Sequence, residues 1–238
     1  MRLHVLPSPY YAANCVVLVP QGSASALVVD PSVGILAAIR AVLDAEGVGV
    51  GAVLATHGHP DHVWDCAEVA SWAGEAPAPV WIPGPDRYRM DDPLAHILMP
   101  PPLEVGPWRK PSDLRDFPAG SVEVVDGLRM KMVPAPGHTE GSAVFLGHCD
   151  LEAVAEGEVL YSSQTPVPWA LSGDVIFAGS VGRTDLPGGD ETQIRHSLRT
   201  LGNVLDPATL LVPGHGSMTS MERELASNPY LARAMRVG

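Results

Sequence analysis

Short apolar runs separated by turn-forming residues mark the first third of the chain. The runs that predict strands are residues 15–19, 26–29 and 50–55. Residues 34–46 place apolar side chains at helical spacing, and Gly47 is a typical residue to end such a helix. A second helix is expected from about Val63 to Ala73. This part of the chain therefore predicts strands followed by an αβ unit.

The remainder of the chain carries similar patterns. Asp126-Gly127 lies between two alternating apolar runs and is a strong hairpin signal. Further strands are expected at residues 80–82, 144–146, 175–177 and 209–212, and helices at 191–201 and from about 221. The proline-rich residues 83–118 and the acidic residues 149–168 predict irregular excursions. Because no repeat or linker is evident, residues 1–238 are expected to form a single domain.

Composition and charge narrow the class of protein. Of the 238 residues, 46% are hydrophobic and 18% are charged, which favours a sizeable core and argues against general disorder. The formal net charge is -12, and the basic residues are spread along the chain. Proteins that bind nucleic acid are expected to show a basic face, because neutralising phosphates supplies most non-specific affinity. Nucleic acid is therefore not expected as a partner.

The cysteines and the N-terminus bear on location. Cys15, Cys66 and Cys149 are odd in number and widely spaced, which is not the pattern of a disulfide framework and indicates a reducing compartment. The first residues lack the apolar region and cleavage site of a signal peptide. No apolar run approaches the roughly 20 residues that cross a bilayer. We expect a cytoplasmic protein without a membrane partner, and the sequence leaves its oligomeric state open.

Histidine and aspartate residues recur at the ends of predicted strands, beside glycine or turn residues. The candidate ligands are His57, His59, Asp61, His62, His138, Asp174 and His215. The first four follow a single strand within one short loop. A loop can aim alternate side chains at one point, and neighbouring glycines permit the backbone turns that this requires. The pattern predicts a metal site.

The number and type of candidate ligands indicate two metal ions. Imidazole and carboxylate groups favour zinc, iron or manganese over calcium, which prefers an all-oxygen shell. A mononuclear zinc site needs only three or four protein ligands, so we expect two divalent ions, zinc foremost, with iron or manganese as alternatives. The expected ligands are His57, His59 and His138 for one ion and Asp61, His62 and His215 for the other. Asp174 is expected to bridge the ions, because only a carboxylate among these groups can reach both.

The whole set resembles the metallo-β-lactamase superfamily, whose loop pattern is H-x-H-x-D-H, and it matches at all seven positions. The resemblance covers nearly the whole chain and implies an α/β fold, the αββα sandwich of two mixed β-sheets flanked by helices. Residues 172–185, 136–142 and 228–230 are similar to the glyoxalase II (hydroxyacylglutathione hydrolase) branch. Only about 23 residues follow His215, so the chain resembles the shorter, single-domain members.

This resemblance implies a hydrolase that cleaves a thioester, a small-molecule acyl-thiol similar to S-lactoylglutathione. Two metal ions would lower the pKa of a bridging water, and the resulting hydroxide would attack the thioester carbonyl. A thiolate leaving group, with a free pKa of roughly 8.5, needs little help from an acid. The catalytic residues implied are His57, His59, Asp61 and His62, and Asp61 could also orient the hydroxide.

Two other functions are compatible with the resemblance. Related persulfide dioxygenases use a single iron held by two histidines and one aspartate. The complete ligand set, together with residues 177–180 after Asp174, favours the hydrolase. A binding or regulatory protein on the same scaffold is the third possibility, although it would be expected to have lost ligands. The native thiol, the acyl group and the metal are not fixed by the sequence.

Overall fold

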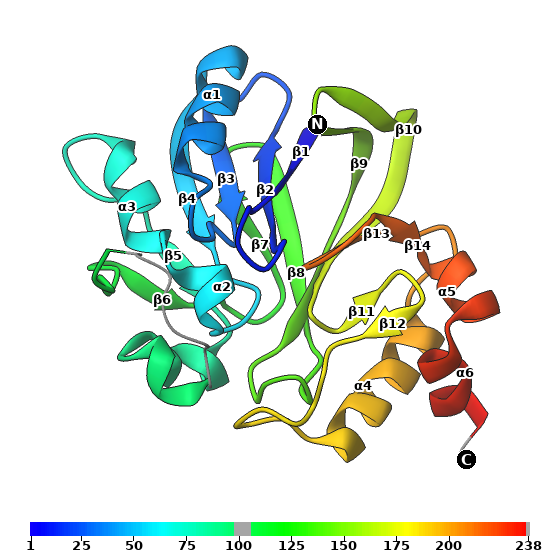
Figure 1. Ribbon diagram of the computed structural model, residues 1–238. Helices are drawn as coiled ribbons and strands as arrows, with labels where there is room; N and C mark the ends of the chain where they lie inside the picture. The colour runs from blue at the N-terminus through cyan, green and yellow to red at the C-terminus, as the bar shows by residue number, and fades with distance from the viewer. Residues whose placement is uncertain (98–105, 237–238) are drawn as a thin grey trace.

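The computed structural model describes residues 1–97 and 106–236 (Figure 1). The strands are β1 (Arg2–Pro7), β2 (Asn14–Val19), β3 (Ser25–Val29), β4 (Gly49–Leu54), β5 (Val80–Ile82), β6 (Leu114–Asp116), β7 (Ser121–Val125), β8 (Leu128–Pro134), β9 (Ala143–Ala155), β10 (Glu158–Gly173), β11 (Ile176–Phe177), β12 (Ser180–Val181), β13 (Leu210–Pro213) and β14 (Thr219–Ser220). The α-helices are α1 (Leu36–Glu46), α2 (Pro60–Val63), α3 (Cys66–Ala70), α4 (Glu191–Val204), α5 (Met221–Ser227) and α6 (Pro229–Arg236). The 3-10 helices are η1 (Ser71–Ala73), η2 (Gly84–Met90) and η3 (Pro93–His96).

Strand pairing within these described residues runs through one 12-stranded mixed sheet. Its order is β14-β13-β10-β9-β1-β2-β3-β4-β5-β6, with β8 attached to β9 and β7 to β8. The parallel pairing of β1 with β9 joins an N-terminal half of the sheet to a C-terminal half. β11 and β12 form a separate two-stranded sheet.

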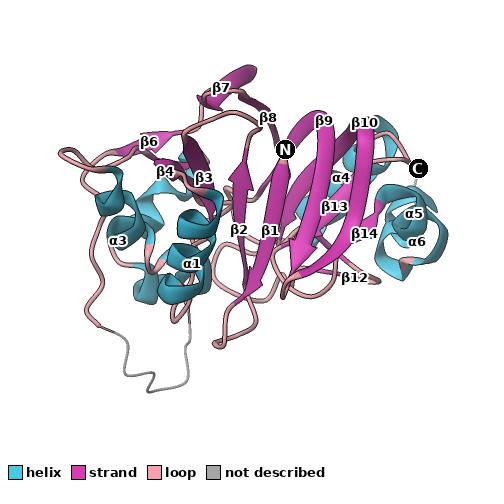
Figure 2. Ribbon diagram, turned by 90° about the horizontal axis from the view of Figure 1, so that it is seen from above, coloured by secondary structure: helices cyan, strands magenta, loops and turns pink. Residues whose placement is uncertain are grey.

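The two halves of the sheet pack face to face, and helices cover both outer faces. Side chains from both halves, among them Leu18, Leu54 and Phe145, form one buried cluster between them. A second cluster joins α1 and α3 to the N-terminal half, and a third joins α4 and α6 to the C-terminal half. Figures 1 and 2 show the two groups of helices on opposite sides of the strands. The predicted αββα sandwich is confirmed, with its two halves joined by the β1–β9 pairing.

Helix α1 shows how apolar spacing gives this packing. Ile39 and Leu43 are four residues apart and are both buried against the sheet. Burying a side chain of this size stabilises a fold by roughly 1.5–3 kcal/mol. The helix ends at Gly47, whose left-handed backbone (φ 68°) is readily adopted only by glycine. The following strand, β4, is thereby aimed at the loop that carries the first candidate ligands.

The excursions predicted from the sequence have regular structure. Residues 149–168 are not an irregular loop: they belong to β9 and β10, which pair antiparallel as far as Ala155 and Glu158. That part of the prediction is wrong. Residues 83–118 contain η2, η3 and the strand β6, and residues 98–105 lie outside the described part.

Two helices are divided more finely than the sequence predicts. The helix expected over residues 63–73 is split into the end of α2, then α3 and η1. The C-terminal helix is split at Asn228, whose side-chain oxygen accepts hydrogen bonds from the N–H groups of Tyr230 and Leu231 and so begins α6. Among the helices of the described residues, none combines the length and the apolar character needed to span a membrane.

Candidate metal centre

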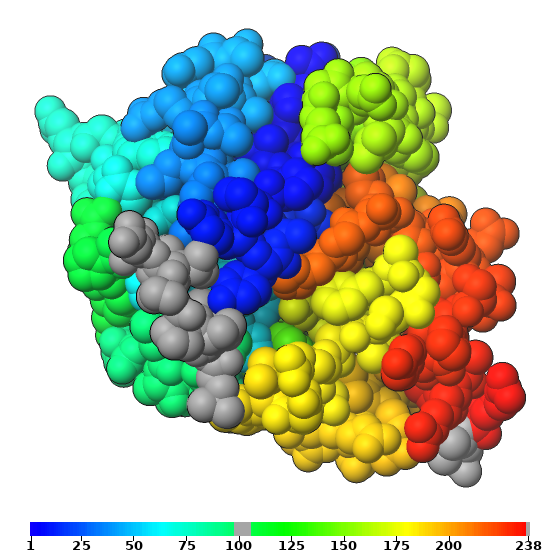
Figure 3. Space-filling view, in the orientation of Figure 1, coloured from blue at the N-terminus to red at the C-terminus, as the bar shows by residue number. Residues whose placement is uncertain are grey.

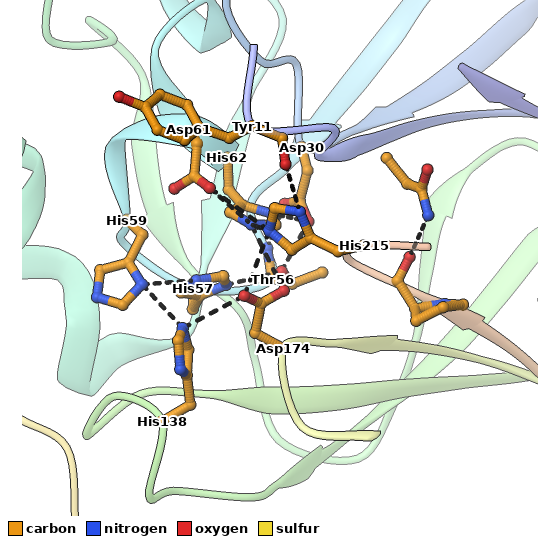
Figure 4. A network of polar contacts seen from close by, with 12 residues as sticks. Tyr11, Asp30, Thr56, His57, His59, Asp61, His62, His138, Asp174 and His215 are labelled. Atoms are coloured by element: carbon orange, nitrogen blue, oxygen red, sulfur yellow. Dashed lines mark hydrogen bonds and ion pairs between the residues drawn. The ribbon is translucent and has the colours of Figure 1, made fainter. Parts of the chain in front are cut away.

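The seven predicted ligands lie together at the ends of strands from both halves of the sheet. They come from the loop and short helix after β4, the loop between β8 and β9, and the residues that follow β10 and β13. Figure 4 shows their side chains pointing toward one another. In Figure 3 the blue segment before β2, the yellow segment around β11 and β12 and the orange segment after β13 meet on one face. The geometry therefore brings together every residue that the sequence singled out.

One group consists of three buried histidines. Nδ1 of His59 lies 3.1 Å from Nε2 of His57 and 2.9 Å from Nε2 of His138. One nitrogen from each ring lies within 4.8 Å of the other two. Three imidazoles gathered in this way could hold a divalent cation.

A second group, Asp61, His62 and His215, lies nearer the surface. Nε2 of His62 is 3.2 Å from Nε2 of His215, and Oδ2 of Asp61 is 3.4 Å from the same His215 nitrogen. The side chains of His215 and Asp61 are 25% and 16% exposed, whereas His62 is buried. Solvent therefore contacts the centre on the side of Asp61 and His215.

Asp174 lies between the two groups. Its Oδ2 is 3.4 Å from Nε2 of His138 and 3.5 Å from Nε2 of His215, and its Oδ1 is 3.5 Å from Nε2 of His62. This carboxylate faces ligands of both groups, as a bridging group must.

The donor set fits two divalent cations. Opposed ring nitrogens such as those of His62 and His215 need either a proton or a cation between them. Among the described residues, buried Oδ1 of Asp174 has no hydrogen-bond partner, and it lies 3.5 Å from Nε2 of His62. Buried polar atoms are normally paired, so an unpartnered carboxylate oxygen that faces ring nitrogens fits a cation held between them.

Asp30, in a left-handed conformation (φ 49°) directly after β3, supports the centre from behind. Its Oδ1 accepts a hydrogen bond from the Thr56 N–H at 2.7 Å. Its Oδ2 accepts one from the Thr56 hydroxyl at 2.7 Å and lies 2.9 Å from Nδ1 of His62. The contact directs Nε2 of His62 toward the second group, in the way that carboxylates commonly orient metal-binding histidines.

Backbone carbonyls orient two further rings. Nδ1 of His138 lies 2.7 Å from the carbonyl oxygen of Arg183, and Nδ1 of His215 lies 3.0 Å from that of Tyr11. If each Nδ1–H donates, each Nε2 is left free to face the centre. Tyr11 has a left-handed backbone (φ 59°) and a partly exposed side chain.

In the metal-free protein, burial is the main influence on the pKa values of His57 and His59. It lowers the pKa of His57 well below its ordinary value. Burial, with the neighbouring His138, lowers the pKa of His59 to about 3. His57 and His59 are therefore neutral at pH 7, with lone pairs available to a cation.

Carboxylates dominate the second group. Burial opposes the charged form of His62, but Asp174 and Asp61 raise its pKa to about 9. Burial likewise opposes protonation of His215, but hydrogen bonds to Asp174 and Asp61 raise its pKa to about 10. A cation that bound here would displace protons that now offset the carboxylates.

Some supporting residues escaped the sequence reasoning. Asp30 ends a predicted strand and fits the resemblance to the glyoxalase II branch, but the sequence does not indicate that it contacts a ligand, and nothing in the sequence marks Tyr11. The residue Asp86 on η2, which accepts hydrogen bonds from two ligand loops, was also missed. Neither Tyr11, which precedes β2, nor Asp86, an isolated aspartate, stands in a local sequence pattern that indicates such a role.

Comparison with protein families gives a match over residues 9–150 to the model described as the metallo-beta-lactamase superfamily. An uncharacterized protein of Mycobacterium tuberculosis (strain ATCC 25618 / H37Rv) is 31% identical over 97% of this chain and 98% of its own. A hydroxyacylglutathione hydrolase, GloC, of Haemophilus influenzae is 27% identical over 97% of this chain and 98% of its own.

Solved structures agree on the fold. The BLEG-1 B3 metallo-beta-lactamase superimposes with a TM-score of 0.72 at 24% identity, covering 96% of this chain and 99% of that one. TTHA1623 in a di-iron-bound form gives 0.69 at 25% identity, covering 95% and 98%. ETHE1 from Myxococcus xanthus gives 0.70 at 18% identity, covering 99% and 88%.

Proposed function

Because the chain belongs to the metallo-β-lactamase superfamily, we propose that it is a metal-dependent hydrolase that cleaves a thioester, an acyl-thiol similar to S-lactoylglutathione. The observation that carries this proposal is that seven histidine and aspartate side chains form overlapping groups, with Asp174 within 3.5 Å of both His138 and His215. Such a donor set suits the activation of water for hydrolysis.

The proposed cofactors are two divalent metal ions, zinc foremost, with iron or manganese as alternatives. The proposed ligands are His57, His59 and His138 for one ion, Asp61, His62 and His215 for the other, and Asp174 for both. When bound, the ions would supply a water of lowered pKa and positive charge for the developing oxyanion. The di-iron form of the similar TTHA1623 supports a two-metal site and keeps iron among the candidates.

The chain's own groups meet the remaining chemical needs. Asp61 is on the accessible side of the centre, where its carboxylate can accept a hydrogen bond from the attacking water and orient it. The buried His57, His59 and His138 keep solvent from the opposite side. A thiolate leaving group, with a free pKa of roughly 8.5, departs without a strong acid. An amide nitrogen would need one.

The similarity to the GloC hydrolase over 97% of this chain supports a glutathione thioester as the first substrate to try. The sequence from Ser172 to Asp185, which includes Asp174, carries the resemblance to that branch. The three cysteines are unpaired, which supports the cytoplasm as the proposed compartment.

Thiol release from an acyl-thiol panel tests the proposal. The pure protein is stripped with a chelator, reloaded with zinc, iron(II) or manganese, and mixed with S-lactoylglutathione and thioesters of other thiols. We expect hydrolysis that depends on added metal. Asp61→Asn should lower the rate by on the order of 100-fold or more. Asp65→Asn, a partly exposed aspartate outside the centre, should leave the rate unchanged.

The same preparation separates the other candidate functions. Oxygen uptake with glutathione persulfide, in the absence of thioester hydrolysis, would identify a dioxygenase. ETHE1 shares the fold at 18% identity, which is fold-level similarity only. A protein that binds metal but turns over neither substrate class would contradict the proposal and favour a binding role.

A further inference from the structure

A buried carboxylate outside the centre joins two of its loops. Asp86 lies on η2 and is 0% exposed. Its Oδ2 accepts hydrogen bonds from the Gly58 N–H and the Thr139 hydroxyl, both at 2.7 Å, and its Oδ1 accepts one from the Gly141 N–H, also at 2.7 Å. Both oxygens are therefore engaged, and all three donors belong to loops that carry candidate ligands.

The positions of these donors are informative. Gly58 separates His57 from His59, and Thr139 directly follows His138. One side chain thus fixes the two segments that supply all three members of the histidine group. A displacement of Asp86 would move those three rings relative to one another.

Arg89, one turn further along η2, completes the arrangement. It is also 0% exposed, and its Nε lies 3.4 Å from Oδ1 of Asp86. Its Nη2 donates to Oε2 of Glu140 at 2.5 Å and to the carbonyl oxygen of Pro187 at 2.9 Å. A buried carboxylate is costly unless it is paired and hydrogen-bonded, and here it is both.

The packing leaves little freedom around this pair. A Cβ at Gly58 would lie 2.7 Å from Cβ and Cδ of Arg89, and one at Gly141 would lie 2.6 Å from Cβ of Asp86. Both ligand loops are therefore pressed against η2 through glycines. The second group has supports that do not involve Asp86, because Asp30 contacts His62 and the Tyr11 carbonyl contacts His215.

We propose that the Asp86–Arg89 pair is a positioning device for one metal subsite only, the one formed by His57, His59 and His138. The inference rests on the proposed metal site. Asp86 hydrogen-bonds to no ligand side chain and acts through two backbone N–H groups and the Thr139 hydroxyl of the two loops. Asp30, by contrast, serves both subsites, because it contacts His62 directly and also holds Thr56, whose hydroxyl lies 3.1 Å from Nδ1 of His57.

Metal binding by isosteric variants tests this selectivity. Asp86→Asn keeps the shape but places an NH2 group against an N–H or hydroxyl donor. Zinc content is measured by elemental analysis after dialysis at fixed free zinc. Wild-type protein should retain two ions and Asp86→Asn one, with affinity for the other lowered by about 10- to 100-fold. Asp116→Asn is the matched control, because Asp116 pairs with Arg87 of the same helix at the exposed surface.

Cobalt spectra identify which subsite is lost. Asp86→Asn and His215→Gln should each retain one ion but differ in their absorption, since the remaining ligand sets differ. Thr139→Val removes a single donor to Asp86 and should weaken the same subsite less, which covers the case of an Asp86 variant that does not fold. The melting temperature of each metal-free variant reports general damage.

Several outcomes would overturn the inference. Unchanged affinity for both ions in Asp86→Asn and Thr139→Val would do so. So would equal weakening of both subsites in proportion to a lower metal-free melting temperature, which would indicate a structural role. Wild-type protein that binds no metal would overturn the proposed function as well, so the two failures are distinguishable.

Discussion

There is no room for a side chain at Gly214, the residue just before His215. A Cβ at this position would lie 2.1 Å from Oδ1 of Asp174 and 2.9 Å from Cε1 of His62. We predict that Gly214→Ala displaces Asp174, with the loss of at least one bound metal ion and a fall in thiol-release rate on the order of 100-fold. Elemental analysis and the thioester assay check this.

Gly49→Ala is the matched control for that change. Gly49 begins β4, the strand that leads to the ligand loop, and a Cβ there would only reach 4.0 Å from the carbonyl oxygen of Ala24. This variant should bind metal as wild type does. Full metal content in Gly214→Ala would show that the Asp174 carboxylate can shift without affecting the centre.

The perturbed histidines predict how stability of the metal-free protein depends on pH. His59 has a folded pKa lowered to about 3, so its contribution is present above its unfolded value of 6.5 and is lost as pH falls. His62 and His215 have folded pKa values raised to about 9 and about 10, so their contributions are present below 6.5 and are lost as pH rises. Stability should be greatest near pH 6.5.

Melting temperatures of the chelated protein between pH 4 and pH 10 measure this profile. His59→Gln should flatten its acid side, and His215→Gln should flatten its alkaline side. Identical profiles for the two variants would show that the opposed environments of these rings are not what sets the pH dependence.

For single residues, the sequence predicts the metal ligands far better than it predicts the residues that position those ligands. His57 and its neighbours stand in a dense local pattern that chance seldom produces, so their gathering was foreseeable. Asp86 is 28 residues from Gly58 in sequence, and its contact depends on how η2 folds back over the loop. An isolated aspartate in a proline-rich segment looks like a surface residue until tertiary structure buries it.

Among the elements, α4 offers a direct test of local stabilisation. The side chain of Asp190 precedes the helix and accepts hydrogen bonds from the N–H groups of Thr192 and Gln193 at 2.7 and 2.8 Å. Asp190→Ala should lower the free energy of unfolding by about 1 kcal/mol, as typical helix caps do. Urea unfolding of the metal-loaded protein measures this.

Metal binding should survive that substitution. The link from this helix to the ligand loop is a bond from the Asp190 backbone N–H to the carbonyl oxygen of Gly137, which an alanine retains. Glu191→Ala, at the exposed first position of the helix, is the control and should change stability little. Loss of a metal ion in Asp190→Ala would show that the cap itself holds the His138 loop.

The sequence predicts a strand or helix well where at least one of its faces is buried. It predicts poorly a strand that is exposed on both faces. β2 and β3 are buried along nearly their whole length, and their apolar runs revealed them. Residues 156–165, by contrast, are mostly exposed, so the distal ends of β9 and β10 carry no burial pattern. Their strand character comes from pairing with each other, a tertiary property that leaves little trace in composition.

For the whole molecule, the centre lies where it can connect the two halves of the sheet. His57 and His62 follow β4 in the N-terminal half, whereas Asp174 and His215 follow β10 and β13 in the C-terminal half. Ions held among them would link residues more than 150 positions apart in sequence. Metal binding should therefore stabilise the native fold as a whole, because the unfolded chain offers no preformed site.

The fall in melting temperature when metal is removed measures how much the ions stabilise the native fold. A ligand present at 100 times its dissociation constant stabilises the native state by about 2.7 kcal/mol per site, so chelation should lower the melting temperature by several degrees. A double variant, Asp61→Asn with His215→Gln, removes two ligands of the second group while leaving the buried histidine group intact, and should lose about half as much on chelation. An equal loss would mean that the second group contributes nothing to native-state binding. The ion among His57, His59 and His138 would then supply all of the metal-dependent link between the halves, beside protein contacts such as the hydrogen bond from Nδ2 of Asn14 to the carbonyl oxygen of Pro213.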